Sequence, residues 1–383
     1  MNADVVHIIT GLDVGGAERS LTNLITHGLS GELAHAVISL TSEGVFGAPI
    51  RDAGVPVYSL GMRRGVPSPV GAWRLRKLVA ELKPRVLQGW MYHGNLAASV
   101  ICRTIPVKPC LVWNIRQSLY DIRTEKILTR WIVRRHVSLS AQVDGIIYNS
   151  EVARRQHETL GIESGQARVL VNGFDVERFR PDQQRRVSLR QKLGIPQGAI
   201  VIGHAGRFHP MKNHRGFLRA TARLSSGNPD LHIVLCGPDI TPGNSALRAL
   251  ADELDHSRVH LIGEQPKMED LLPAFDLLCS SSSWGEGFPN VVGEAMACGV
   301  PCVVTDVGDS SRLVSDCGTV VPPLDEETLI IALAEMASLS HETRTGLGDR
   351  ARKLVADRYS IDSAVMAYQS LYREMLMVED ADL

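Results

Sequence analysis

The chain has 383 residues, of which 44% are hydrophobic and 22% charged, and its formal net charge is −1. A chain of this length exceeds what one compact core usually holds, so we expect an ordinary globular protein of two domains. The near-neutral balance predicts no nucleic-acid partner, and no apolar run approaches the length needed to span a bilayer.

The seven cysteines are scattered without a Cys-x2-Cys pair, so neither a disulfide framework nor a zinc site is indicated. This cysteine usage, with no basic segment at the start, predicts a cytoplasmic protein. Residues 1–170 hold 20 Lys and Arg against 13 Asp and Glu. The basic excess favours an acidic acceptor, or peripheral contact with the anionic inner face of a membrane. The alternative is a solvated surface that leans positive.

The first half alternates short apolar strands with helical patterns, which indicates a doubly wound parallel sheet whose ligand crevice lies at the strand carboxyl ends. Gly15 and Gly16 follow the first strand, where the missing side chains let backbone amides approach a ligand. His93, Asn114 and Arg116 follow later strands and are candidate site residues. Strands are expected at 5–9, 36–40, 55–60, 86–88, 111–115, 145–148 and 169–171. Helices are expected after the turn stretch at 10–19, ending at about residue 29, and at 70–82, 95–103, 125–140 and 151–160.

Residues 122–135 mix Arg and Lys with Trp and Ile. Such a basic amphipathic segment suggests a face that contacts a membrane. The competing interpretation, which we favour, is a core helix whose basic side chains extend into water. The basic residues that would join this face are Arg63, Arg64, Arg74, Arg76 and Lys77.

A polar, turn-rich stretch at 172–181 predicts the domain boundary, with one domain at 1–172 and the next at 173–359. Arg207 and Lys212 lie in a loop after the first strand of the second domain. Arg offers a planar fork of donors and Lys a compact charge, so the two can neutralise a diphosphate together. Second-domain strands are expected at 200–203, 231–236, 259–262, 277–280, 302–305 and 319–321, and helices at 326–339, 342–357 and 362–377.

Residues 276–304 read as strand, loop, helix, turn and strand. Pro289 suits the first helical position, and the backbone N–H groups around it form an anion site at the helix N-terminus. Glu286 precedes this helix, and Glu294 lies about one turn inside it. A carboxylate accepts two hydrogen bonds from a sugar diol, so carboxylates on either side of an anion site suit a nucleoside diphosphate sugar.

Two stretches together resemble the signatures of the retaining glycosyltransferase family 4, which has the GT-B fold. One is Glu-Gly-Phe-Pro-Asn-x3-Glu-Ala-Met-Ala-Cys-Gly at 286–299, and the other is Gly-Arg-x4-Lys-Asn at 206–213. The resemblance implies two Rossmann-like, doubly wound α/β domains that face each other across a deep cleft. It also implies that a last helix at 360–383 returns to the first, acceptor-side domain.

The resemblance further implies roles for individual residues. Arg207, Lys212, Glu286 and His93 are the expected catalytic residues, although a lone histidine is as often a capping or packing residue. Asn114 and Arg116 are acceptor candidates, with a surface salt bridge as the alternative for Arg116. The expected donor-binding residues are Gly15, Gly16, Gly206, Arg207, Lys212, Glu286, Gly287, Phe288, Pro289, Asn290, Val291 and Glu294.

The expected activity is retaining transfer of a hexosyl or N-acetylhexosaminyl group from a nucleoside diphosphate sugar to a saccharide or lipid-linked saccharide. Cations and backbone amides would stabilise the leaving diphosphate, so we expect neither a metal ion nor a cofactor. A nucleotide-sugar epimerase of the same fold is one alternative. A non-catalytic nucleotide-sugar-binding subunit of a polysaccharide assembly complex is the other.

Overall fold

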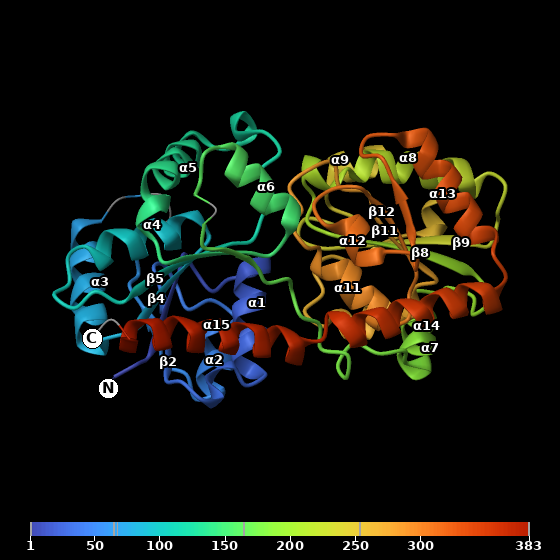
Figure 1. Ribbon diagram of the computed structural model, residues 1–383. Helices are drawn as coiled ribbons and strands as arrows, with labels where there is room; N and C mark the ends of the chain where they lie inside the picture. Colours follow the sequence, from blue (N-terminus) through green and yellow to red (C-terminus); the bar gives the residue numbers. More distant parts are fainter. Residues whose placement is uncertain (1, 64–65, 67, 164, 253, 382–383) are drawn as a thin grey trace. The chain divides into compact units, whose positions relative to one another are not determined.

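The computed structural model describes residues 2–63, 66, 68–163, 165–252 and 254–381, and Figure 1 shows its elements. The chain divides into two compact units, called here the first unit (Met1–Gly173 with Ile361–Leu383) and the second unit (Phe174–Ser360). Each unit is built on a parallel sheet of its own. Arg64, one of the basic residues grouped above, lies outside the described residues, as do residues 382–383.

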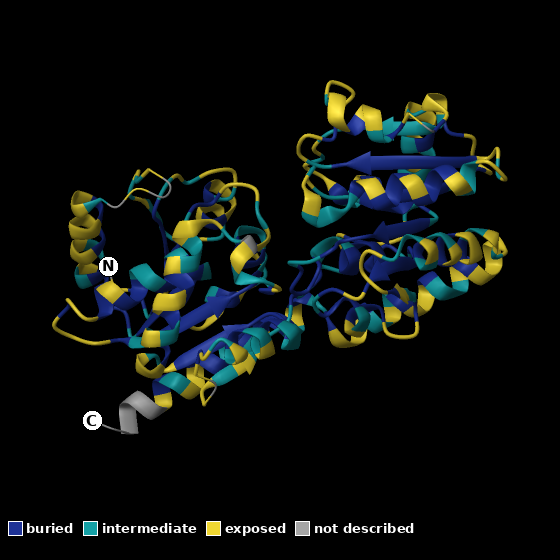
Figure 2. Cartoon of the chain, turned by 90° about the horizontal axis from the view of Figure 1, so that it is seen from above, coloured by how far each residue is buried: buried dark blue, intermediate teal, exposed yellow. Residues whose placement is uncertain are grey.

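The first unit contains a seven-stranded parallel sheet in the order β3-β2-β1-β4-β5-β6-β7. Every residue of β1, β2 and β4 is buried, as expected for parallel strands that are covered on both faces. In Figure 2 these central strands are correspondingly coloured as buried. The strands are β1 (Val5–Ile9), β2 (His35–Ser39), β3 (Val57–Ser59), β4 (Val86–Trp90), β5 (Cys110–Ile115), β6 (Gly145–Tyr148) and β7 (Ala167–Val169).

Helices cover both faces of this sheet. They are α1 (Gly16–Thr26), α2 (Gly47–Asp52), α3 (Pro69–Leu82), α4 (Met91–Cys102), α5 (Ile127–Leu139), α6 (Glu151–Thr159) and α15 (Ile361–Ala381). Side chains of α3 and α4 pack with Val6 and Ile8 of β1, whereas side chains of α1 and α15 pack with Val5 and Ile9. Because successive side chains of a strand point to opposite faces, the two helix groups lie on opposite sides of the sheet.

The last helix, α15, belongs to the first unit although the whole second unit precedes it in sequence. Its Tyr372 hydroxyl donates to Gln88 Oε1 of β4 at 2.5 Å, and its Tyr368 hydroxyl accepts from Asn114 Nδ2 of β5 at 2.9 Å. Both tyrosines are buried, and burying such large rings stabilises the helix against the sheet. The core of the first unit therefore contains residues from both ends of the chain.

The second unit contains a six-stranded parallel sheet in the order β10-β9-β8-β11-β12-β13. The strands are β8 (Ile200–Ala205), β9 (Leu231–Cys236), β10 (Val259–Leu261), β11 (Leu277–Ser280), β12 (Cys302–Thr305) and β13 (Thr319–Val321). The order of strands reverses direction between β8 and β11. In doubly wound sheets, ligands bind outside the strand carboxyl ends at such a reversal.

Helices also cover both faces of the second sheet. They are α7 (Gln183–Lys192), α8 (His214–Ser225), α9 (Ser245–Leu250), α10 (Met268–Leu271), α11 (Asn290–Ala297), α12 (Ser310–Val314), α13 (Glu326–Ser338) and α14 (His341–Arg358). Side chains of α8, α9 and α13 pack with Val303 of β12. The neighbouring Cys302 instead contacts the carbonyl of Val292 in α11, which places α11 on the opposite face.

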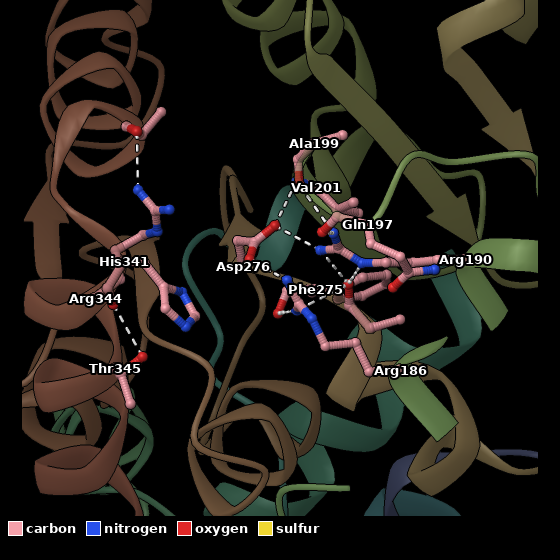
Figure 3. Close-up of polar contacts among 12 residues, drawn as sticks. Arg186, Arg190, Gln197, Ala199, Val201, Phe275, Asp276, His341, Arg344 and Thr345 are labelled. Atoms are coloured by element: carbon pink, nitrogen blue, oxygen red, sulfur yellow. Dashed lines mark hydrogen bonds and ion pairs between the residues drawn. The ribbon is translucent and has the colours of Figure 1, made fainter. Parts of the chain in front are cut away.

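A buried ion-pair network holds α7 against the second sheet (Figure 3). The Arg190 guanidinium is fully buried, lies 2.6 Å from Asp276 Oδ2, and also donates to the carbonyls of Ala274, Gln197 and Ala199. Arg186 approaches the other Asp276 oxygen at 2.7 Å. Both oxygens of Asp276 have a guanidinium partner, as a buried charge requires.

The structure differs from the sequence expectations in several places. β7 spans Ala167–Val169, two residues before the expected 169–171. α4 begins at Met91, directly after β4, so His93 lies in the first helical turn and not in a loop. Met91 has φ 61°, and this single left-handed residue turns the strand into the helix without a connecting loop. In addition, α7 and the short helices α2, α9, α10 and α12 were not expected from the sequence. None of the described helices combines the length and hydrophobicity needed to cross a membrane.

Candidate functional site

The loop after β8 places Lys212 at the carboxyl edge of the second sheet. The Lys212 carbonyl oxygen accepts a hydrogen bond from the Ser281 hydroxyl at 3.1 Å and lies 3.3 Å from His204 Nε2. Asn213 follows in the left-handed conformation, and its Oδ1 accepts from the Gly216 N–H at 3.1 Å. Asparagine tolerates this conformation and is a preferred helix cap, so it ends the loop and starts α8.

Lys212 and Glu286 form an ion pair at the centre of the site. Lys212 Nζ lies 2.5 Å from Glu286 Oε1, and the Ser282 hydroxyl donates to the same oxygen at 2.6 Å. The Lys212 side chain is 17% exposed and the Glu286 side chain 11%, so the pair is largely buried but still partly accessible to a ligand. These residues are 74 positions apart, and the packing of β8 beside β11 brings them together.

The neighbours of Glu286 keep its carboxyl group ionised. Burial by itself raises the pKa of Glu286, but the Lys212 charge and the hydrogen bonds from Lys212 and Ser282 lower it below the ordinary value of 4.5. The charge of Arg207 lowers this pKa further. Arg207 is exposed at the surface, so its guanidinium remains accessible to a ligand beside the ion pair.

Residues 308–309 support the loop that carries Glu286. The Asp309 N–H donates to the Gly287 carbonyl at 2.8 Å. Gly308 has φ 61°, and a Cβ there would lie 2.4 Å from the carbonyl oxygens of both Glu286 and Gly287. Any other residue would collide with this backbone, so Gly308 allows the close approach that fixes the Glu286 loop.

α11 begins at Asn290, and Pro289 is the residue before its first turn. The expectation that Pro289 occupies the first helical position is therefore wrong by one residue. Pro289 has an extended ψ of 115°, and its carbonyl accepts from the Gly293 N–H at 3.4 Å, as a capping residue does. First-turn N–H groups such as that of Val291 point out of a helix N-terminus, where the helix dipole favours an anion.

Two other residues of the expected site are buried. Glu294 lies just over one turn inside α11, is 3% exposed, and adds to the effect of burial in raising the pKa of Cys236 to about 12. The Phe288 ring stacks on Phe174 at a centroid distance of 6.1 Å and contacts the edge of Tyr359 at 5.2 Å. Phe288 can therefore offer a ligand its main chain only.

Gly206 lies between the end of β8 and Lys212. Its N–H donates to the Cys236 carbonyl at 2.9 Å, and a Cβ there would meet the Lys212 side chain at 3.2 Å. The glycine thus leaves room for Lys212 to lie along the loop. Ser282, Gly308 and Asp309 support the site as well, and sequence reasoning missed them. The run of serines at 280–283 after an apolar strand was the available signal for Ser282.

The remaining expected donor-site residues belong to the first unit. Gly15 precedes α1 and Gly16 begins it. A Cβ on Gly15 would lie 2.2 Å from the Glu18 carboxylate, so glycine provides space there. His93 lies in the first turn of α4, at the wall of an apolar cavity. The structure groups Arg207, Lys212 and Glu286 in the second unit. Their roles, the catalytic role of His93 and the donor-binding roles of Gly15 and Gly16 stay predictions.

Asn114 and Arg116 make contacts inside the first unit. Arg116 Nη1 donates to the Tyr368 hydroxyl at 2.9 Å, its Nη2 donates to Asn172 Oδ1, and its guanidinium lies 5.4 Å from the centroid of a Trp90 ring. Both residues are buried. The surface salt bridge considered for Arg116 is therefore wrong, because its partners are neutral and buried. The acceptor role of these two residues stays a prediction.

α5 overlaps the basic segment 122–135 and has features both of a core helix and of a membrane-contacting face. Ile132 and Val133 are buried, whereas Arg134 and Arg135 are exposed, as in a core helix with basic side chains in water. Trp131 on the same helix is nevertheless 51% exposed. Among the residues that the structure describes, no group of three or more His, Cys, Asp or Glu side chains could hold a metal ion.

Two family models match the chain. The model described as Glycosyltransferase Family 4 matches residues 14–178, and the model described as Glycosyl transferases group 1 matches residues 186–354. The second match contains the loop of Lys212 and the whole of α11 with Glu294. The two matches divide the chain as the two sheets do, and together they cover most of its length.

Known proteins share parts of the sequence. The D-inositol 3-phosphate glycosyltransferase of Saccharomonospora viridis is 33% identical over 248 residues, which cover 62% of this chain and 57% of that relative. The match therefore spans little more than half of that relative's length. The UDP-Gal:alpha-D-GlcNAc-diphosphoundecaprenol alpha-1,3-galactosyltransferase of Escherichia coli is 22% identical over 310 residues, 79% of each chain.

The fold is shared with solved structures. Anabaena Alr3699/HepE in complex with UDP matches with a TM-score of 0.83 at 19% identity, over 98% of this chain and 100% of that one. At this identity the likeness shows the fold alone, and that fold is the GT-B type with two parallel sheets. With a family model matching each sheet's part of the chain, the protein belongs to the family 4 glycosyltransferases.

Proposed function

We propose that the protein transfers a hexosyl or N-acetylhexosaminyl group from a nucleoside diphosphate sugar to a saccharide or lipid-linked saccharide, with retention of configuration. The observation that carries this proposal is the ion pair between Lys212 and Glu286, supported by Ser282. It combines a cation suited to a phosphate with an ionised carboxylate suited to sugar hydroxyls.

The donor would lie with its diphosphate next to Arg207, Lys212 and the first turn of α11. Two cations and a helix N-terminus supply the charge that a departing diphosphate needs, so no metal ion has a required role. Glu286 would accept hydrogen bonds from the sugar hydroxyls, and Glu294 from the ribose diol. His93 keeps the catalytic role, and the amides of Gly15 and Gly16 keep the donor-binding roles, that the resemblance implies.

The proposed reaction takes place on one face of the donor sugar. The bond between the anomeric carbon and the diphosphate oxygen breaks while the acceptor oxygen bonds to the same carbon from the same side. The acceptor's hydroxyl proton passes to the departing phosphate oxygen. Lys212 and Arg207 stabilise the negative charge on that diphosphate, and Glu286 is occupied by sugar hydroxyls and does not attack the anomeric carbon.

The test is a transfer assay with UDP- and GDP-linked hexoses and N-acetylhexosamines, using polyprenyl-diphosphate-linked N-acetylglucosamine as acceptor. This acceptor is chosen because the name of the E. coli relative specifies it. NMR of the product should show a new glycosidic bond with the anomeric configuration of the donor. Arg207→Ala and Lys212→Ala should each lose about 3–4 kcal/mol of transition-state stabilisation, whereas the exposed Lys192→Ala should retain full activity.

Other results would assign a different function. An epimerised sugar formed from the donor without acceptor would identify an epimerase. Tight nucleotide-sugar binding without transfer to any acceptor pool would identify a binding subunit. Near-normal turnover of the Arg207→Ala/Lys212→Ala double variant would refute the assignment of these two residues to the leaving diphosphate.

A further inference from the structure

The first unit contains a cavity of about 480 Å³ beside α3, α4 and α5. This volume lies in the range of about 300–1,000 Å³ that is typical of sites for small organic ligands. Its walls are predominantly apolar, and hydrocarbon side chains from all three helices contribute. The main apolar lining residues are Met62, Leu75, Leu96, Val100, Leu128 and Trp131.

Polar side chains reach this cavity from the carboxyl edge of the first sheet. Thr10 directly follows β1, Thr41 lies just beyond β2, and His93 lies just beyond β4. Because β2, β1 and β4 are neighbours in a parallel sheet, these three residues share one edge. The cavity thus combines an apolar body among the helices with a polar margin at the edge where doubly wound sheets bind ligands.

The remaining polar residues of the lining are Ser68 and the positively charged Arg63. Arg63 lines the cavity and is exposed. Trp131, also in the lining, is half-exposed, and the Arg135 guanidinium lies 5.4 Å from its ring centroid. This aromatic–cation pair and Arg63 favour a ligand that is apolar along most of its length and anionic at one end. The basic excess of residues 1–170 has the same sign preference.

We infer that this cavity binds the hydrocarbon chain of the acceptor, a lipid in which a phosphate or diphosphate joins the chain to the sugar. The chain would lie among α3, α4 and α5, and the phosphate would lie near Arg63. The receiving sugar would then emerge at the sheet edge beside Thr10 and His93. The cavity is open to solvent along one side, where Val100 and Trp131 are about half-exposed. A groove of this kind holds one hydrocarbon chain along its length, whereas a bilayer surface contacts a protein over a convex or flat face.

That the bound hydrocarbon chain belongs to the acceptor rests on the proposed function, whereas the binding of a hydrocarbon chain does not. The experiment therefore measures binding to the full-length protein by calorimetry, with the donor site saturated by UDP. The probes are geranyl, farnesyl and geranylgeranyl diphosphate, inorganic diphosphate as the headgroup alone, and phosphatidylglycerol vesicles as an anionic membrane surface. Affinity should rise by up to about fourfold per buried methylene and then level off when the cavity is full.

Two variants test the location. Val100 lines the cavity and is 46% exposed, so Val100→Glu should fold and should reduce farnesyl diphosphate binding at least tenfold. Val107→Glu is the matched control, because Val107 is 72% exposed and outside the lining, and it should bind as the unmodified chain does. Ala97→Phe should weaken binding of the longest chain most, because the new ring fills part of the volume.

The outcomes separate the two proposals. Binding that is independent of chain length, or equal in Val100→Glu and Val107→Glu, would overturn the inference about the cavity. Binding only to anionic phospholipid vesicles, and not to prenyl diphosphates, would assign this face to a membrane surface and overturn it as well. Chain-length-dependent binding with no sugar transfer to any lipid-linked acceptor would leave the cavity assignment standing and refute the proposed function.

Discussion

The Lys212–Glu286 pair allows a prediction with opposite signs for its two members. In the structure Lys212 Nζ lies 2.5 Å from Glu286 Oε1, so in the free protein the lysine charge is already engaged by the carboxylate. A bound diphosphate would compete for that charge. Lys212→Met should therefore weaken nucleotide binding, whereas Glu286→Gln should leave it unchanged or strengthen it while abolishing efficient transfer.

The magnitudes follow from the type of contact. A hydrogen bond to a charged group contributes roughly 1.5–3 kcal/mol, so Lys212→Met should weaken UDP binding by about 10- to 150-fold. Loss of its charge on the leaving group should lower kcat by a further factor of about 10² to 10³. In Glu286→Gln the amide keeps the shape of the side chain and a partner for Ser282. Only the negative charge that competes with the diphosphate is removed.

Isothermal titration calorimetry with UDP and GDP, followed by the transfer assay, measures both effects. Lys192→Met is the control, because Lys192 is an exposed lysine of the second unit at the end of α7. The Lys212→Met/Glu286→Gln double variant should bind UDP about as weakly as Lys212→Met, because the carboxylate affects UDP binding mainly through its contact with the lysine. The reasoning is refuted if Lys212→Met binds UDP within twofold of the unmodified chain, or if Glu286→Gln loses as much affinity as Lys212→Met.

Three further predictions concern pH, stability and metal. Because the folded-state pKa of Glu286 is below 4.5, its ionisation stabilises the fold above about that pH, and this stabilisation is lost as the pH falls through the folded-state pKa. When Tm is measured by circular dichroism at decreasing pH, the Tm of Glu286→Gln should therefore fall less than that of the unmodified protein. Arg190→Met leaves Asp276 buried without its closest cation and should cost about 3–5 kcal/mol of unfolding free energy of the second unit in urea, and Arg190→Met/Asp276→Asn should regain part of it. Dialysis against EDTA should leave the rate of sugar transfer unchanged, and a rate restored only by Mg²⁺ would contradict metal-free leaving-group stabilisation.

Local sequence patterns were sufficient to predict the elements that form each sheet. β1, β6, β9, β11 and β12 occur at the predicted residues, because a short apolar run bounded by turn residues buries itself as a strand inside a sheet. β13, at the edge of the second sheet, also occurs at the predicted residues. The motifs also predicted that cationic and acidic side chains follow β8 and β11. The start of α4 was missed because Gly94 and Asn95 suggest a turn, whereas one left-handed residue, Met91, lets the helix begin at once.

Contacts between distant segments were decided by tertiary structure. The sequence supplied Lys212 and Glu286 as separate candidates, but the contact between them depends on β8 and β11 being neighbours in the sheet. The support from Gly308 under the Glu286 loop likewise depends on two backbone segments that lie close together. A Cβ on residue 308 would lie 2.4 Å from the carbonyl oxygens of Glu286 and Gly287. Arg116, for which a surface salt bridge was the alternative, is buried and contacts Tyr368 of a helix more than two hundred residues away.

The physical reason lies in the range of the forces involved. Helix caps, turn conformations and hydrophobic periodicity depend on neighbours within a few residues, so the sequence alone determined the order and type of most elements. The partner of a buried charge, or the space left among three helices, depends on how those elements pack. The ion pair of the candidate site and the apolar cavity beside α3, α4 and α5 could therefore be found only in the folded chain.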